Sequence, residues 1–481
     1  MEFKKAAYFR ILSIMLVFLP AFLPSLAHAS SLAVPELSSY VSIFWAVPFI
    51  GVLLSIALLP LLQPSIWHHH YGKIGVAWGL AFLLPCAMQF GVGLALTSVS
   101  HAFFSEYLPF IVLLATLFVV AGGICVRGNL HGTPALNTGI LALGTVLASV
   151  MGTTGAAMLL VRPLIRANDN REHVKHVMVF FIFLVANAGG ALTPLGDPPL
   201  FLGFLQGVDF LWPLKNLFMQ TAFLCCSLLA IFYLLDRYYY HHREEERPVS
   251  LDPTPDSAIK IEGGINFILL VGIVALVLMS GIWKPGIVFQ VAGQELALQN
   301  ILRDAGLLLL LLFSIKLTPV SARLGNEFTW GPIIEVAKLF AAIFITIVPV
   351  IALLRSGKDG AFSVVVSAVS DQQGQPVNVM YFWISGLLSS FLDNAPTYLV
   401  FFNTAGGDPV QLMGKLAGTL AAISCGSVFM GAMSYIGNAP NMMVKAIAEQ
   451  RHIVMPSFFA YMAWSCGILL PLFAVMSLIF F

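Results

Sequence analysis

The amino-acid sequence predicts an all-α polytopic membrane protein, built from two inverted repeats with re-entrant helical hairpins and discontinuous transmembrane helices. Three observations predict this fold: the composition, apolar runs long enough to cross a bilayer, and a weak internal repeat that places helix breaks at matching positions. Of the 481 residues, 59% are hydrophobic and 10% are charged, whereas about 25% of the residues of a soluble domain are charged. A water-soluble fold cannot cover so much apolar surface, so the chain is expected in a lipid bilayer.

The N-terminal segment has the features of a secretory signal peptide. Lys4, Lys5 and Arg10 precede an apolar run that ends in Ala27-His28-Ala29, a small-x-small cleavage pattern. We expect a signal peptide over residues 1–29 that is cut before Ser30, which would leave the mature N-terminus in the periplasm. The alternative is an uncleaved first span, which the two prolines of this run disfavour.

Apolar runs of roughly 20 residues, the length that crosses about 30 Å of hydrocarbon, recur along the rest of the chain. In the first repeat, over residues 30–236, we expect spans at 40–62, 74–98, 106–126, 174–207 and 216–236, with a shorter apolar pair at 135–163. In the second repeat, over residues 264–481, we expect spans at 264–283, 302–317, 330–354, 416–450 and 456–481, with a shorter pair at 379–402.

Residues 237–263 are the longest hydrophilic stretch and separate the two repeats. We expect a solvated cytoplasmic linker here, and the alternative is a regulatory loop.

Positive charge orients the spans, because cytoplasmic loops are enriched in Lys and Arg. With the N-terminus outside, the positively charged positions fall on one side: Lys73, Arg127, Arg162, Arg166, Arg171, Lys175, Arg237 to Arg247, Lys316, Arg323, Lys445 and Arg451. The loop from Arg355 to Asn378 has as many acids as bases and falls on the other side. The sequence therefore predicts that this loop is periplasmic.

The two repeats match weakly, but the matches fall where residues interrupt helices. The stretch Leu108 to Gly128 resembles Pro332 to Arg355, and the Gly-Thr-Thr-Gly-Ala run at 152–156 corresponds to the Leu-Asp-Asn-Ala-Pro-Thr run at 392–397. Further along, residues 190–199 correspond to residues 431–441, which pairs Thr193 with Ser434, Gly196 with Gly437, Asp197 with Asn438 and Pro199 with Pro440.

These breaks predict re-entrant hairpins. Free backbone N–H and C=O groups cost several kcal/mol each when they face lipid, so the breaks must line protein or water. The segments 135–163 and 379–402 are too short to cross the bilayer twice and too interrupted to cross it once. We expect two hairpins, the first entering from the cytoplasm and the second from the periplasm, which is an inverted-repeat arrangement.

The residues at the breaks are mostly oxygen donors, which favours an ion site near the middle of the bilayer. Carbonyl groups at interrupted helices, together with side-chain oxygens, can coordinate Na+ or H3O+. Asp197 and Asp393 add carboxylates, which are costly in a membrane and mark functional positions. The alternative is that both only cap the broken helices. The predicted ion-binding set is Thr153, Thr154, Gly155, Thr193, Gly196, Asp197, Asp393, Asn394, Thr397, Ser434, Gly437, Asn438 and Asn441.

Within this set we expect Asp393 to be the coupling residue, because it lies at a hairpin tip beside Asn394. A second pair, Glu335 and Lys338, lies three positions apart on one face of an apolar helix, where mutual attraction would lower the cost of burial. Its alternative is an interfacial pair near the cytoplasmic end.

The Asp-Asn-Ala-Pro tip and the two Gly- and Pro-rich breaks resemble the ion transporter superfamily, in particular its NhaD-type sodium/proton antiporters, arsenite permeases and putative citrate transporters. The resemblance covers residues 40–481. It implies a dimer with a scaffold and a moving transport part, and it leaves the substrate open among Na+, citrate and other anions. Ser-Asn-Thr triplets typical of divalent-anion carriers are absent, and no Arg stands at the hairpin tips, so Asp197 and Asp393 favour a cation.

We therefore expect an inner-membrane sodium or lithium/proton antiporter that works by alternating access, with a cation-coupled citrate or other anion transporter as the alternative. No cofactor, nucleic acid or resident metal is predicted, and the six cysteines show no metal-ligand spacing. An intramembrane aspartyl protease is the rival enzyme class; Leu195-Gly196-Asp197 matches part of its Gly-x-Gly-Asp signature, but position 194 is Pro and no Pro-Ala-Leu motif follows Asp393. A channel is disfavoured by the two non-identical half sites.

Overall fold

A computed structural model describes residues 42–243, 257–355, 357 and 362–481. The signal peptide predicted for residues 1–29 lies outside the described residues, as does the middle of the predicted linker.

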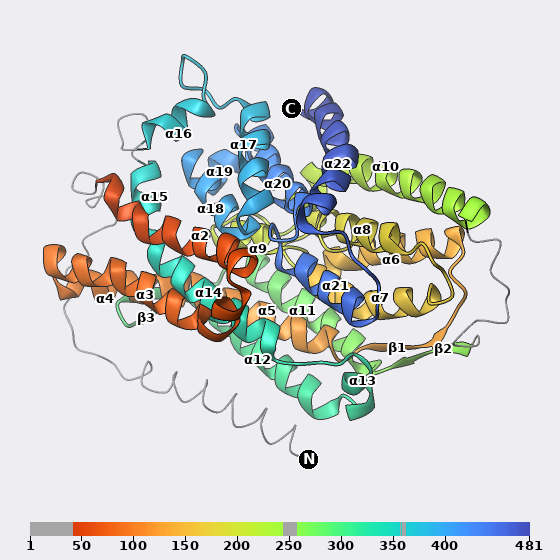
Figure 1. The fold of residues 1–481 in the computed structure, drawn as a ribbon. Coiled ribbons are helices and arrows are strands. Elements are labelled where there is room, and N and C mark those ends of the chain that lie inside the picture. The colour runs from red at the N-terminus through yellow and green to blue at the C-terminus, as the bar shows by residue number, and fades with distance from the viewer. Residues whose placement is uncertain (1–41, 244–256, 356, 358–361) are drawn as a thin grey trace.

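The described chain is almost entirely helical (Figure 1). The helices of the first half are η3 (Ile43–Ala46), α2 (Val47–Leu62), α3 (Pro64–Phe90), α4 (Val92–His101), η4 (Ala102–Tyr107), α5 (Leu108–Ala121), α6 (Pro134–Met151), α7 (Thr153–Ala167), α8 (Lys175–Leu184), η5 (Ala188–Leu192), α9 (Pro198–Leu205) and α10 (Trp212–Arg243). Those of the second half are α11 (Ile265–Ile282), α12 (Leu298–Leu317), α13 (Val320–Gly325), α14 (Gly331–Thr346), α15 (Val348–Arg355), α16 (Ser363–Ala368), α17 (Asn378–Phe391), α18 (Asn394–Thr404), α19 (Pro409–Met413), α20 (Ala417–Phe429), η8 (Met430–Met433), α21 (Ala439–Gln450) and α22 (Phe458–Phe480).

Two small antiparallel ribbons lie at opposite ends of α11. Strand β1 (Cys125–Asn129) pairs with β2 (Ser257–Glu262), and β3 (Val288–Val291) pairs with β4 (Gln294–Ala297). We call these the β1–β2 end and the β3–β4 end of the molecule. In Figure 1 the β1–β2 end also holds the last turns of α10, while α15 and α16 lie toward the opposite side.

Nine helices of the described residues are long and apolar enough to cross a membrane, or ten if the bent pair α14 and α15 counts as one span. The chain is thus an all-α polytopic membrane protein. Several spans follow the predicted ranges closely, among them α2, α11, α12 and α22.

Several helix boundaries differ from the prediction. Helix α3 begins at Pro64, ten positions before the predicted span, because Pro is well suited to the first turn of a helix. The next span runs without a gap from Val92 through the π-helical turn η4 to Ala121. Helix α10 continues to Arg243, and β2 pairs with β1, so both ends of the stretch predicted as linker are folded.

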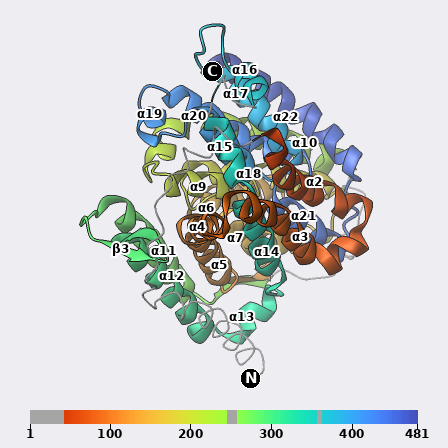
Figure 2. The same cartoon turned by 90° about the vertical axis from the view of Figure 1, so that its left-hand side faces the viewer.

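The helices form two parts. One is a row in which α11 packs on α12, α12 on α5, α5 on α14, α14 on α3 and α3 on α2. Together with η4, which continues into α5, we call it the scaffold row. The other contains α6–α10 and α17–α22 and is called the hairpin unit. Seen from the β3–β4 end, α10, α17, α20 and α22 of the hairpin unit lie above the helices of the scaffold row (Figure 2).

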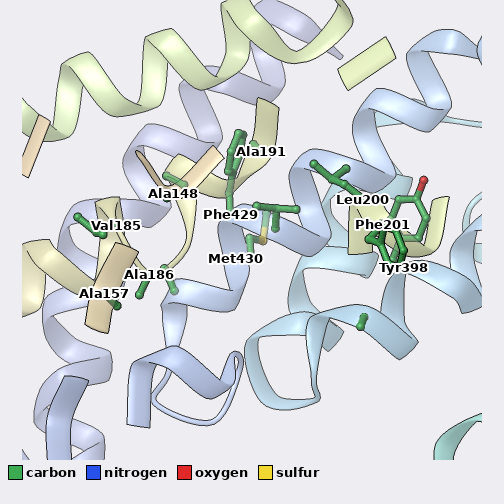
Figure 3. Packing of buried hydrophobic residues seen from close by; sticks show 14 of the residues in the cluster. Ala148, Ala157, Val185, Ala186, Ala191, Leu200, Phe201, Tyr398, Phe429 and Met430 are labelled. Atoms are coloured by element: carbon green, nitrogen blue, oxygen red, sulfur yellow. The ribbon is translucent and has the colours of Figure 1, made fainter. Parts of the chain in front are cut away.

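Small side chains let the helices of the hairpin unit approach closely. Ala148 on α6, Ala157 on α7 and Ala186 after α8 are fully buried, and Figure 3 shows them around the same centre as Phe429 and Met430. Close approach of backbones is what holds helices together in a bilayer, where burying more apolar surface adds little. The packing thus brings interrupted backbone segments into one tightly filled interior.

Candidate functional site

Two helical hairpins enter the hairpin unit from opposite ends. In the first, α6 and α7 meet at Gly152, whose φ of 81° is a left-handed conformation that glycine adopts readily. Its open base lies beside β1, where Arg166 donates a hydrogen bond of 2.7 Å to the carbonyl of Val126. In the second, α17 and α18 meet at Asp393, and its base lies at the end of α15, where Arg355 Nε donates to Asn403 Oδ1 at 2.9 Å.

Each hairpin tip reaches a break in another helix. Between α8 and α9 the chain runs through η5, and between α20 and α21 it runs through η8. Both breaks fold back on themselves at glycines: a Cβ on Gly196 would collide with the carbonyl oxygen of Gly190, and a Cβ on Gly437 would lie 2.6 Å from that of Gly431. This close approach accounts for the paired glycines that the sequence shows.

The two breaks are held by the same hydrogen bonds. Thr193 Oγ1 donates to the carbonyl of Ser149, and Ser434 Oγ donates to that of Ser390. In each case the partners are 44 positions apart. These hydroxyl groups satisfy carbonyls at the ends of α6 and α17, so Thr193 and Ser434 tie each break to the neighbouring hairpin.

Three of the predicted site residues donate hydrogen bonds to the carboxylate of a fourth, Asp197. Asp197 is 1% exposed, and its Oδ1 accepts hydrogen bonds from Thr153 Oγ1 at 3.1 Å and Asn438 Nδ2 at 3.3 Å. Its Oδ2 accepts from Asn394 Nδ2 at 2.6 Å. The partners come from both hairpin tips and from the opposite break. Asp197 is therefore the point at which the two halves of the hairpin unit meet.

The partners of Asp197 are all uncharged. Asn438, its counterpart in the second repeat, stands 241 positions later and supplies an amide in place of a carboxylate. Among the described residues, no Lys or Arg forms an ion pair with Asp197. Two amides and one hydroxyl group can orient the carboxylate, but they do not neutralise its charge.

Asp393 makes different contacts from Asp197. It is partly exposed, and it is the N-cap of α18, where its Oδ1 accepts the backbone N–H of Ala395 at 3.0 Å. Thr397 Oγ1 donates a hydrogen bond to the backbone carbonyl of Asp393 at 3.0 Å. The contacts of Asp393 and Thr397 thus stay within α18, which is the capping alternative.

Asn187 joins the two breaks and was not among the predicted residues. Its Nδ2 donates to Asn441 Oδ1 at 2.7 Å, and its Oδ1 accepts from Asn438 Nδ2 at 3.2 Å. Asn441 in turn donates to the carbonyls of Gly431 and Ser434. Asn187 precedes the Gly-Gly pair of the first break. In the sequence, the signal for it was an amide side chain at the end of an apolar run.

The remaining predicted residues fill space around the tips. Thr154 follows Thr153 in the first turn of α7, and Gly155 packs so closely on α5 that a Cβ would lie 2.8 Å from that of Ala121. Neither contacts Asp197 through a hydrogen bond in the described structure.

Glu335 and Lys338 do not pair with each other in the described structure. Glu335 accepts a hydrogen bond from Trp67 Nε1 at 3.1 Å, and the Lys338 ammonium group lies 5.1 Å from the centre of the Tyr71 ring. Both partners lie on α3. The expected mutual attraction is replaced by contacts that join two helices of the scaffold row, because α14 turns both side chains toward α3.

A buried charged network at the base of the first hairpin was also missed. Asp236 on α10 accepts from Arg171 Nη2 at 2.6 Å and lies 2.7 Å from His176 Nε2. Asn137 at the start of α6 donates to the same carboxylate at 3.0 Å and to Asn168, after α7, at 2.8 Å. The network clamps both arms of the hairpin to α8 and α10, and its members are too far apart in the sequence for a motif.

One family model matches the chain over residues 38–481, and its description is "Putative citrate transport". No curated protein matches the chain.

Proposed function

We propose that this chain, a multi-pass membrane transporter that belongs to the citrate-transport family, exchanges Na+ or Li+ for protons by alternating access. The proposal places the protein in the inner membrane with the β1–β2 end in the cytoplasm and the mature N-terminus in the periplasm. A homodimer is part of the same proposal.

The observation that carries the proposal is the environment of Asp197. An ionised carboxylate buried without a cationic partner is costly, and the cost falls when the group binds either a proton or a cation. Rotating the amide groups of Asn394 and Asn438 by 180° would present oxygen atoms in place of N–H groups. With Thr153 they would complete an oxygen site of the kind that Na+ prefers at broken helices.

Competition at one carboxylate produces antiport. A proton and Na+ cannot both neutralise Asp197 at the same time, so each leaves when the other binds. If only the neutralised site crosses between the two faces of the membrane, transport of one ion requires return of the other. Asp197 is accordingly the coupling residue in this proposal, and Asp393 is the cap that holds the second hairpin tip in place.

Transport of citrate or another anion together with a cation is the second candidate. The family description favours it, and so does the direction of the helices, because α7, α9, α18 and α21 all begin around the site. Helix N-termini attract anions. In this version Asp197 would bind the coupling cation beside the anion.

Ion flux in everted membrane vesicles tests the proposal. Vesicles with the wild-type protein should relieve the quenching of a pH-gradient dye when NaCl or LiCl is added, and choline chloride should have no effect. Vesicles with Asp197→Asn are the matched control and should give no response. If labelled citrate accumulates under a Na+ gradient in proteoliposomes, and neither Na+ nor Li+ exchanges for protons, the anion candidate replaces antiport.

A further inference from the structure

A second buried carboxylate lies outside the Asp197 site, on the scaffold row. Glu106 is 8% exposed and belongs to the π-helical turn η4, in the middle of the span from Val92 to Ala121. Single π-helical turns inside α-helices are often found at functional sites. The run of apolar residues around Glu106 gave no sign of a site in the sequence.

Glu106 has little to offset its charge. Its one hydrogen bond within the described residues comes from Gln206 Nε2 and is long, at 3.5 Å. The nearby charged or titratable groups are Arg355, at the end of α15, and His101, which is exposed at the end of α4. Neither forms a hydrogen bond or ion pair with Glu106 in the described structure.

The other elements packed on η4 contribute no charge to it. Helices α5 and α9 contain no charged residue. On α14, Glu335 and Lys338 contact α3 instead, and on β4 Glu295 is exposed and accepts from Gln290. Glu106 is therefore a buried carboxyl group with one neutral donor beside it, and like Asp197 it forms no ion pair in the described structure.

Helix α9 connects the two carboxylates. Asp197 is its N-cap and Gln206, the donor to Glu106, is its C-cap. The helix has eight residues, which at 1.5 Å per residue corresponds to about 12 Å. The contact between Gln206 and Glu106 also joins the hairpin unit to the scaffold row. A movement of the hairpin unit along α9, toward the β3–β4 end, would bring Asp197 toward the level of Glu106.

We propose that Glu106 is a second binding site for a proton or a monovalent cation, fixed on the scaffold row, which Asp197 approaches when the hairpin unit moves toward the β3–β4 end. The inference rests on the proposed antiport, because it assigns Glu106 to the outer half of the same cycle. Two carboxylates at close range cannot both stay ionised without a cation between them. Their approach would hold the cation until the site opens to the outside.

Stacked aromatic rings border the path between the two carboxylates. Phe110, one helical turn after Glu106, stacks on Phe201 of α9 with 6.3 Å between ring centres and on Phe340 of α14 with 4.6 Å. Phe110 and Phe340 thus present an apolar surface to the moving helix α9. Glu106 is consequently the only acidic residue that η4, α5 and α9 place along this part of the interface.

Carbodiimide labelling of the purified full chain tests the site directly. A hydrophobic carbodiimide reacts with buried protonated carboxyl groups, and mass spectrometry would identify the modified residue. We expect Glu106 to be labelled in choline chloride and protected at least tenfold by NaCl at the same ionic strength. Glu295, an exposed carboxylate toward the same end, is the control and should show no Na+ protection. An unlabelled Glu106, or labelling that NaCl leaves unchanged, overturns the proposal.

Sided kinetics distinguish a binding role from a structural role. In oriented proteoliposomes, Glu106→Gln should raise the half-saturating Na+ concentration at the outer face at least tenfold and change the inner value less than twofold, while Glu106→Asp should recover part of the difference. An equal loss at both faces contradicts the inference. Absence of Na+/H+ exchange by the wild-type protein would reject the proposed function, whereas the labelling result decides on Glu106 independently.

Discussion

At the scale of single residues, three donors converge on Asp197, and this geometry predicts the effect of removing its charge. Asp197→Asn replaces one acceptor oxygen with an NH2 group, which must then face Asn394 or the pair Thr153 and Asn438. One hydrogen bond is lost, at about 1–3 kcal/mol. We expect no Na+-dependent response in everted vesicles and a lower melting temperature of a protein that still folds. Normal exchange by the purified variant would rule out coupling at Asp197.

Asp393 should behave in the opposite way. Its carboxylate caps α18, and Asn caps helices as well as Asp does. We expect Asp393→Asn to keep its exchange activity and melting temperature, and Asp393→Ala to lose about 1 kcal/mol of stability through the missing cap. Vesicle assays and thermal melts of the two variants provide the comparison. Loss of exchange in Asp393→Asn at an unchanged melting temperature would restore the coupling role that the sequence suggested for it.

The sequence could name the residues around the site, but it could not rank them. Thr153, Asp197, Asn394 and Asn438 all stand out because they interrupt apolar runs. Which carboxylate receives the convergent donors depends on how the breaks fold over the hairpin tips, and this is a matter of long-range packing. Glu106 lies inside a continuous span, so no break signals it.

At the scale of elements, the clamp at the base of the first hairpin should be essential for stability. Removing the charge of Asp236 breaks its buried ion pair with Arg171, and breaking a buried pair by removing one partner costs about 3–5 kcal/mol. We therefore expect Asp236→Asn to lower the melting temperature strongly. The control is Glu449→Gln, which breaks the exposed pair with Lys445 on α21 and should change stability by about 0.5 kcal/mol or less. Similar melting temperatures for the two variants would contradict the clamp.

Helix breaks were easier to predict than helix boundaries, for a physical reason. A Gly-, Pro- and Asn-rich stretch in an apolar run leaves backbone groups unpaired, and few arrangements satisfy them inside a membrane. The start of α3 at Pro64 and the end of α10 at Arg243 lie among polar residues, where a helix can continue at little cost. Composition alone does not define such boundaries.

At the scale of the whole molecule, the two hairpins enter from opposite ends and their tips meet at Asp197. Charge bias and the internal repeat, both visible in the sequence, predicted two hairpins that enter from opposite sides, but they did not predict that the tips meet at Asp197. The division into a scaffold row and a hairpin unit came instead from the resemblance. Contacts between the two parts, such as Glu106 with Gln206, join residues far apart in the chain, so neither pattern nor repeat could predict them.

A second contact between the two parts lies toward the β1–β2 end and should control their relative position. Glu327, in the loop between α13 and α14, has a left-handed φ of 49°. Its carboxylate lies 3.3 Å from Arg162 Nη2 on α7 and 2.5 Å from Arg451 Nη2 after α21. This one side chain thereby ties a loop next to the scaffold row to both repeats of the hairpin unit.

Breaking this tie should change the conformational equilibrium more than the stability. The pair between Arg451 and Glu327 is exposed on both sides, and such pairs contribute about 0–1 kcal/mol. Arg451→Gln breaks this pair and leaves the buried Arg162 with its carboxylate, so it should melt close to the wild-type temperature. Even 1 kcal/mol lost from one of two states changes their ratio about fivefold. Since the tie holds the hairpin unit toward the β1–β2 end, its loss should favour movement toward the β3–β4 end.

A single cysteine at the exposed position Ala439, beside Asn438, should then react faster with a membrane-impermeant maleimide from the periplasmic side. Glu449→Gln is again the matched control, and an equal labelling rate in both variants would show that the pair of Arg451 with Glu327 does not hold the two parts together.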